Sequence, residues 1–182
     1  MKVIFLDIDG VLNVKNWHEK KSHFFIDEDK TKLLAKLIKE TNSKVILSSS
    51  WREPYFDEIV SNANGNVISE AHKIFNKYKI PLVDKTPSYK TREDEIISKI
   101  VEYNLDSYVV FDDKLLDLPN VIQTNQEVGL TEKDIAKALE ILSYPSYSTL
   151  EDIKKIKAEK ECYDFLNNYG VFVNPAKQQI QR

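Results

Sequence analysis

Two aspartates close the first hydrophobic run of the chain, in the stretch KVIFLDIDGVLN over residues 2–13. Asp7 and Asp9 stand one residue apart, directly after apolar side chains that fit a buried strand. A buried carboxylate without a partner either costs several kcal/mol or takes up a proton. Two such groups therefore predict a bound cation or a catalytic role. The alternative, a pair of turn-capping aspartates, leaves the preceding apolar run unexplained.

Polar groups also end two other hydrophobic runs. The run KVILSSS ends in Ser48, Ser49 and Ser50, and the run YVVFDD ends in Asp112 and Asp113. Ligands of open parallel sheets bind at the carboxyl ends of the strands, so these groups are expected to meet at one edge. Clustered carboxylates repel each other, and a hard divalent cation such as Mg²⁺ relieves that repulsion. Carboxylates with Mg²⁺ suit phosphoryl chemistry.

The elements that must position these groups alternate along the chain. Continuous β-branched and aromatic runs are typical of strands buried on both faces of a parallel sheet. Helical spacing of apolar residues, with Thr91 and Thr131 as expected N-caps, predicts amphipathic helices between the strands. The alternation predicts an α/β fold, with a Rossmann-like parallel sheet and helices on both faces. The expected strands are 3–8, 44–50, 108–113 and 120–125, and the expected helices are 27–42, 91–104 and 130–142.

The length of 182 residues predicts one domain with its own core. We expect that core over residues 1–143, with residues 14–26 as a short loop or hairpin, a flap over the end of the first strand. The turn-rich YPSYS begins a C-terminal extension, residues 144–182, which we expect to be helical and packed on the same domain.

Composition excludes several classes of protein. The net charge is −3, from 26 basic and 29 acidic residues, so the chain has no global basic field for nucleic acid. Cys162 is the single cysteine, which excludes an internal disulfide and fits a reducing compartment. The first apolar run is too short for a signal peptide or a membrane span. We therefore expect a cytoplasmic protein, and export without a cleaved signal stays open.

Four motifs carry a resemblance to a known family. DIDGVLN, then SSSWR, then YKTRED and then VVFDDK follow each other along residues 2 to about 142. This order resembles the four motifs of the haloacid dehalogenase (HAD) superfamily of phosphohydrolases. More narrowly, DGVLN with SSSWR is similar to the HAD domains of Swiss Army Knife RNA-repair proteins. The resemblance implies a HAD-like core with a minimal cap or none.

The resemblance implies a role for each acidic residue. Asp7 would be the nucleophile that forms an aspartyl-phosphate, and Asp9 would be the general acid and then the general base. Mg²⁺ would be held by the side chains of Asp7 and Asp112, by the backbone carbonyl of Asp9, and by Asp113 directly or through water. Gly10 permits the turn that separates the two aspartates and is expected beside the substrate.

The remaining site residues are also implied by the resemblance. Ser49 would hold the transferring phosphoryl group, with Ser48 as the alternative one residue away. Lys90 would offset the negative charge on nucleophile and phosphate, with Lys85 as its rival. Arg52 could reach a second substrate phosphate, or it could stack on the neighbouring tryptophan.

These residues together predict a Mg²⁺-dependent phosphomonoesterase with an open site. An open site favours large substrates that exclude water themselves, and the resemblance to the domains of RNA-repair proteins makes a polynucleotide end our first choice. Lys15, Lys20 and Lys21 in the flap could meet a phosphate-rich ligand. A phosphotyrosine or phosphoserine protein is the alternative substrate. A phosphorelay receiver fits less well because its motifs follow another order along the chain. A non-catalytic binding module also fits less well, because every expected site position is filled. The sequence says nothing about oligomeric state.

Overall fold

The computed structural model describes residues 1–14, 26–52, 56 and 68–144. The chain divides into two compact units, Met1–Ser146 and Tyr147–Arg182, and the second unit lies outside the described residues. The same holds for residues 15–25 of the expected flap, with its three lysines, and for Cys162. The expected C-terminal extension and its packing therefore stay predictions.

A five-stranded parallel sheet forms the centre of the first unit. Its strand order is β3-β2-β1-β4-β5, and every neighbouring pair is parallel. This confirms the predicted Rossmann-like α/β fold. β1 and β4 lie in the middle, and their residues are almost completely buried because both faces of the sheet are covered. The strands are β1 (Lys2–Leu6), β2 (Lys44–Leu47), β3 (Leu82–Lys85), β4 (Ser107–Asp112) and β5 (Val121–Gln123).

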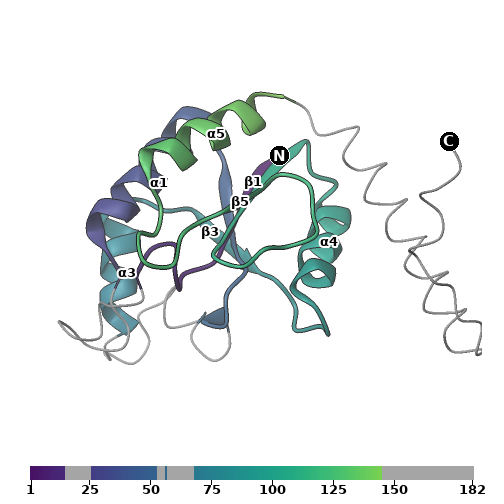
Figure 1. Cartoon of the computed structure of the whole chain (residues 1–182), viewed down its shortest axis with the longest axis horizontal. Coiled ribbons are helices and arrows are strands. Elements are labelled where there is room, and N and C mark those ends of the chain that lie inside the picture. The colour runs from purple at the N-terminus through teal and green to yellow at the C-terminus, as the bar shows by residue number, and fades with distance from the viewer. Residues whose placement is uncertain (15–25, 53–55, 57–67, 145–182) are drawn as a thin grey trace, which may run out of the picture. The chain divides into compact units, whose positions relative to one another are not determined.

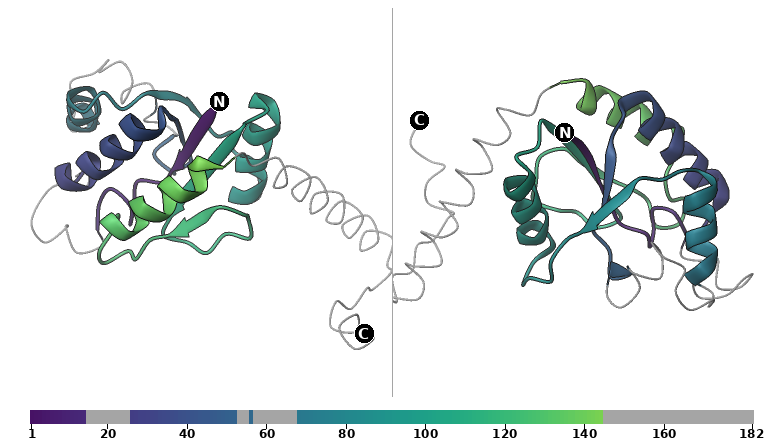
Figure 2. Two further views of the ribbon diagram at one scale, coloured as in Figure 1. Left: turned by 90° about the horizontal axis from the view of Figure 1, so that it is seen from above. Right: turned by 180° about the vertical axis from the view of Figure 1, so that it is seen from behind.

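Helices cover the two faces of the sheet. The helices are α1 (Glu28–Thr41), α3 (Ile68–Lys77), α4 (Arg92–Tyr103) and α5 (Glu132–Ser143). α1, α3 and α5 pack on one face, and α4 lies on the other, as Figure 1 and the reversed view in Figure 2 show. The chain crosses from one face of the sheet to the other between α3 and α4, because α4 connects β3 to β4 along the opposite face. The predicted site lies at the carboxyl ends of β1 and β4.

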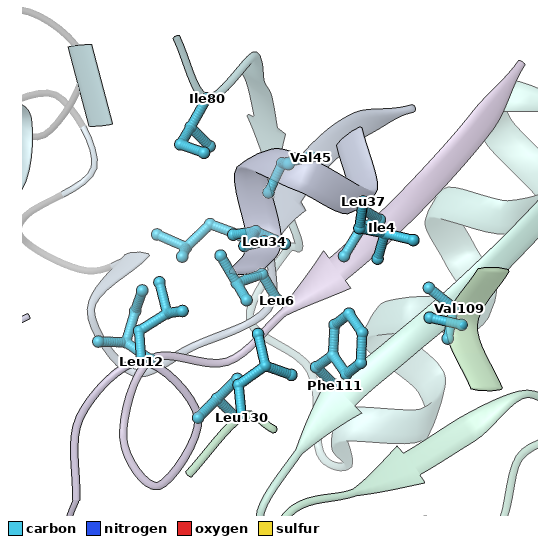
Figure 3. Packing of buried hydrophobic residues seen from close by; sticks show 14 of the residues in the cluster. Ile4, Leu6, Leu12, Leu34, Leu37, Val45, Ile80, Val109, Phe111 and Leu130 are labelled. Carbon is cyan, nitrogen blue, oxygen red and sulfur yellow. The ribbon is translucent and has the colours of Figure 1, made fainter. Parts of the chain in front are cut away.

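The larger part of the core lies between the sheet and the three-helix layer. Ile4 and Leu6 of β1 contribute to it together with Leu34 and Leu37 of α1 (Figure 3). The alternate residue Phe5 faces α4's side and meets Tyr108 edge to face, with ring centroids 6.0 Å apart. Successive side chains of β1 point to opposite faces of the sheet, and both sets are buried, so β1 is held in the middle of the sheet.

Hydrogen-bonded caps start the helices where the sequence predicts them. Thr91 accepts a hydrogen bond from the Asp94 N–H, and Thr131 forms a reciprocal capping box with Asp134. β3 and α3 were not expected from the sequence. None of the helices within the described residues is long and apolar enough to cross a membrane.

Candidate active site

The carboxyl ends of the two central strands bring three carboxylates together. Asp7 follows β1, and its N–H donates to the Phe111 carbonyl of β4 at 2.9 Å, so the two strand ends stay in register. Asp112 closes β4 and Asp113 follows it. Asp7, Asp112 and Asp113 each place a carboxylate oxygen within 4.8 Å of the others. The convergence expected from parallel topology is therefore present.

Gly10 allows the turn after β1 to lie against this cluster. Its φ of +74° lies in the left-handed region, and a Cβ there would stand 2.6 Å from the Cβ of Asp113. Its carbonyl accepts a hydrogen bond of 2.7 Å from the Thr124 hydroxyl after β5. Any larger residue at position 10 would push the turn away from Asp113, so Gly10 shapes the site through its backbone.

The turn places Asp9 at the edge of the three-carboxylate cluster and not within it. Asp7 is buried, with 5 % of its surface exposed, whereas Asp9 is exposed to solvent. Asp9 accepts hydrogen bonds from the Trp51 indole N–H at 3.0 Å and from the Asn13 amide at 2.8 Å. Two aspartates one residue apart thus occupy different environments, as different chemical roles would require.

Burial and mutual repulsion dominate the electrostatics of the cluster. Burial raises the pKa of Asp7 to about 7, and the Asp112 charge adds to this, while Arg92 and a hydrogen bond from Ser49 oppose it. Burial also raises the pKa of Asp113, again with a contribution from Asp112. Carboxylate oxygens at this spacing are the donor set that Mg²⁺ prefers. A divalent cation held by the three side chains would remove the repulsion and keep Asp7 ionised.

Ser49 lies against Asp7 and Ser48 does not share that contact. The hydrogen bond from Ser49 lowers the pKa of Asp7, and the Ser49 hydroxyl itself accepts from the Trp51 backbone N–H at 3.3 Å. The Ser48 hydroxyl is buried and finds no hydrogen-bond partner within the described part of the chain. Of the two serines left open by the sequence, Ser49 is the one placed beside Asp7.

Arg92, which the sequence did not single out, is a cation that pairs with two members of the cluster. Its Nη1 donates to Asp112 Oδ2 at 3.1 Å, lies 3.8 Å from Asp7 Oδ1, and also donates to the Ser48 carbonyl. Lys90 is exposed and joins none of the ion pairs found among the described residues. Lys85 donates to the Arg52 carbonyl at 3.2 Å instead. Of these three cations, Arg92 is the one that lies within ion-pair distance of the cluster, and the role expected for Lys90 stays a prediction.

Arg52 is paired inside the protein. It is 8 % exposed, and its Nη2 donates to Glu95 Oε1 at 2.6 Å. Glu95 also lies 3.7 Å from the Arg92 Nε, one helical turn earlier in α4. A buried carboxylate between two guanidinium groups fixes both of them. The ion pair with Glu95 connects Arg52 to the first turn of α4. A substrate phosphate would have to displace Glu95 to bind the Arg52 guanidinium.

A polar cleft of about 710 Å³ opens beside Asp113. Acidic, basic and amide side chains line it, and so does the end of β5. The Gln123 amide donates to the Asp113 carbonyl at 3.1 Å, which ties the cleft wall to the cluster. The lining residues are Asp113, Lys114, Gln123, Thr124, Asn125, Gln126 and Glu127.

Comparison with known proteins assigns the chain to a family. The family model described as the HAD domain in Swiss Army Knife RNA repair proteins matches residues 3–135. No curated protein and no solved structure gives a match to the chain. The match covers both central strand ends, Ser49 and Arg92, and it supports a HAD-type hydrolase. The chain therefore belongs to the family of HAD domains found in Swiss Army Knife RNA repair proteins.

Proposed function

We propose that the protein is a Mg²⁺-dependent phosphomonoesterase that works through an aspartyl-phosphate on Asp7. The observation that carries this proposal is the buried Asp7, with two further carboxylates on one side and Ser49 and Arg92 beside it. A buried nucleophile next to a cation site and fixed donors is the arrangement that phosphoryl transfer needs. Family membership supports the hydrolase class.

In the first step, an Asp7 carboxylate oxygen attacks phosphorus, and the bond from phosphorus to the leaving oxygen breaks. Asp9 gives its proton to that oxygen, which leaves as an alcohol. Arg92 contributes positive charge beside the forming Asp7–phosphorus bond, and Ser49 offers its hydroxyl to the phosphoryl oxygens. Together these groups stabilise charge that develops in the transition state.

In the second step, Asp9 takes a proton from water, and the water oxygen attacks the phosphorus of the aspartyl-phosphate. The Asp7–phosphorus bond breaks, inorganic phosphate leaves, and both aspartates return to their starting forms. The exposed position of Asp9 fits this exchange, because it must meet both the leaving group and water.

The side chains of Asp7, Asp112 and Asp113 would hold Mg²⁺. When bound, the ion supplies positive charge that neutralises the phosphoryl oxygens and aligns them for in-line attack. Arg92 already donates to the Asp112 carboxylate at 3.1 Å, so this chain's own guanidinium would add positive charge to that supplied by the ion.

The substrate that we propose is the phosphorylated end of a polynucleotide. The polar cleft beside Asp113 gives the leaving group a place next to the reacting centre. Amides such as those of Gln123, Asn125 and Gln126 can hydrogen-bond to sugar hydroxyls and base edges. A phosphopeptide is the alternative occupant, and it competes in the test below.

Hydrolysis of p-nitrophenyl phosphate, with and without Mg²⁺, tests the chemistry. We expect Mg²⁺-dependent turnover that Asp7→Asn abolishes, while Asp117→Asn, which changes an exposed aspartate outside the cluster, keeps the parent rate. The mechanism is wrong if Asp7→Asn turns over as fast as the parent. Acid trapping of phosphoenzyme adds a direct readout.

The substrate class is tested separately. Oligonucleotides with 3′- or 5′-phosphate are compared with phosphotyrosine and phosphoserine peptides by kcat/KM. An advantage of about tenfold or more for one oligonucleotide end, or about 1.4 kcal/mol, supports the proposal. A preference of the same size for a phosphopeptide would replace the polynucleotide end with a phosphoprotein.

A further inference from the structure

Both oxygens of the Asp9 carboxylate accept hydrogen bonds from named side chains. The Trp51 indole N–H reaches Oδ2 at 3.0 Å, and the Asn13 amide reaches Oδ1 at 2.8 Å. The two donors come from different parts of the chain, since Asn13 follows β1 and Trp51 follows β2. An exposed carboxylate is thereby fixed in one orientation at the edge of the three-carboxylate cluster.

Neither donor is free to turn away. Trp51 is 5 % exposed, and its ring packs in the hydrophobic core. Asn13 is 2 % exposed, and its Oδ1 accepts the Gly10 N–H at 2.9 Å. Because the Asn13 amide oxygen accepts the Gly10 N–H, the amide nitrogen is the atom that faces Asp9 and donates to it. The buried pair therefore presents two N–H groups at a set distance from each other.

Stability alone gives a weak reason for this arrangement. A hydrogen bond to a solvent-exposed carboxylate replaces one to water, and its net contribution is about 1 kcal/mol. Reaction geometry gives a stronger reason, because a general acid must meet the leaving oxygen within hydrogen-bond reach. A carboxylate oxygen offers about two acceptor positions, so each one still has a position for the transferred proton.

We infer that Trp51 and Asn13 are positioning residues that hold Asp9 for proton transfer to the leaving group and from water. This inference rests on the proposed phosphomonoesterase chemistry and adds the two groups that orient its acid and base. Without them, the Asp9 side chain would rotate into solvent, and proton transfer would become rare while Asp7 and its surroundings stayed intact.

The leaving group separates this role from a merely structural one. p-Nitrophenolate leaves without a proton, so the first step with p-nitrophenyl phosphate needs little help from Asp9. An alkyl phosphate such as β-glycerophosphate needs the proton as the bond breaks. Because kcat/KM reports only the steps up to release of the alcohol, loss of positioning should lower kcat/KM selectively for the alkyl ester.

Two variants remove one donor each. Trp51→Phe keeps an aromatic ring but has no indole N–H. Asn13→Asp keeps the oxygen that accepts from Gly10 and replaces the donor by an oxygen that repels Asp9. Tyr108→Phe is the matched control, because it removes a buried polar group on the other side of the sheet. Thermal unfolding with and without Mg²⁺ identifies any variant that fails to fold.

With Trp51→Phe, we expect kcat/KM for β-glycerophosphate to fall about 10- to 100-fold, within the range of a general acid contribution. For p-nitrophenyl phosphate, kcat/KM of this variant should fall less than about threefold. A burst of p-nitrophenol should precede a slower steady rate, because the attack of water on the aspartyl-phosphate also needs Asp9. Asn13→Asp should follow the same pattern, and Tyr108→Phe should match the parent on both esters.

Equal losses on the two esters in both folded variants, or no loss in either, would overturn the inference while leaving the phosphatase proposal in place. A parent enzyme that hydrolyses neither ester with Mg²⁺ would instead defeat the proposed function. If Trp51→Phe is unfolded, Asn13→Asp decides the question alone.

Discussion

Arg92 donates from Nη1 to Oδ2 of Asp112 at 3.1 Å, which ties the first residue of α4 to the last residue of β4. The guanidinium lies 16 % exposed at the edge of the carboxylate cluster. Its Nε lies 3.7 Å from the Glu95 carboxylate, which also forms an ion pair with Arg52. This chain of contacts makes Arg92 part of the rigid sheet edge, although it stands on a helix.

Arg92→Gln should lower phosphatase activity far more than Lys90→Ala. The Arg92 Nη1 lies 3.8 Å from the carboxylate of the proposed nucleophile Asp7, and loss of one stabilising contact to a transition state typically costs about 3 to 4 kcal/mol. Lys90 is exposed, so its removal should change kcat/KM by less than about threefold. Steady-state kinetics with p-nitrophenyl phosphate measures both. Equal losses in the two variants would indicate that Lys90 moves into the site when substrate binds.

The sequence alone could not choose among the cations of this region. Lys85, Lys90 and Arg92 lie within eight residues, and a motif match gives the lysine at the helix start as the natural choice. The path of the loop before α4 decides which one reaches Asp112. One signal was present in the sequence, because Glu95 stands three residues after Arg92 and oppositely charged side chains at that spacing can pair on a helix.

The acidic residues were predictable for a simple topological reason. Strands buried on both faces show up as continuous apolar runs, and the groups that end them must meet at one edge. β3 was missed because it is an edge strand of four residues, half exposed, with Asp84 and Lys85 at its end. α3 was missed although Ala71 and Phe75 are spaced as one buried face. The hydrogen bonds that Trp51 and Asn13 donate to Asp9 were missed because these two donors come together only in the folded protein.

Mg²⁺ should raise the unfolding temperature of the protein. An ion that binds only the folded state at 100 times its Kd adds about 2.7 kcal/mol to the free energy of unfolding. Asp112→Asn should remove most of this shift, because it takes a carboxylate out of the cluster. Asp9→Asn is the matched control and should keep it, since the Asp9 side chain is held outside the cluster. Differential scanning calorimetry with a Mg²⁺ titration measures the shift.

The opposite pattern would contradict this assignment. If Asp9→Asn lost the Mg²⁺ shift while Asp112→Asn kept it, the ion would bind at the mouth of the site. The three-carboxylate cluster would then need another explanation.

Glu95→Gln should destabilise the protein strongly. The substitution leaves two guanidinium groups without their buried carboxylate, and breaking a buried ion pair from one side typically costs about 3 to 5 kcal/mol. Glu102→Gln, which removes the solvent-exposed partner of an ion pair with Lys99 on the same helix, should cost at most about 1 kcal/mol. Urea unfolding followed by circular dichroism gives both values. Similar midpoints for the two variants would mean that the buried network is not formed in solution.

Asp84 should make stability depend on pH in the acid range. It accepts hydrogen bonds from Lys99 at 2.6 Å and Tyr103 at 2.7 Å, which link β3 to α4. Burial raises the pKa of Asp84, but these two hydrogen bonds, a third from the Lys85 N–H and the charge of Lys99 together hold its pKa below the usual value. The unfolded chain therefore takes up the proton first as the pH falls. The stabilisation is fully present above about pH 5 and is lost progressively as the pH falls below about 4 and through the lower pKa of the folded protein.

Asp84→Asn tests this linkage because it cannot ionise. Near pH 7 the variant should be less stable than the parent by about 1 kcal/mol, the size expected for a partly exposed charged hydrogen bond. The difference should shrink as the pH falls below about 4, where the unfolded chain takes up the proton first, and it should approach zero once Asp84 of the folded parent is protonated too. Urea unfolding at pH 7, 5 and 3 measures it, with Asp117→Asn as an exposed control that should show no such trend. A difference that stays constant over this range would show that the contact contributes through packing and not through the charge of Asp84.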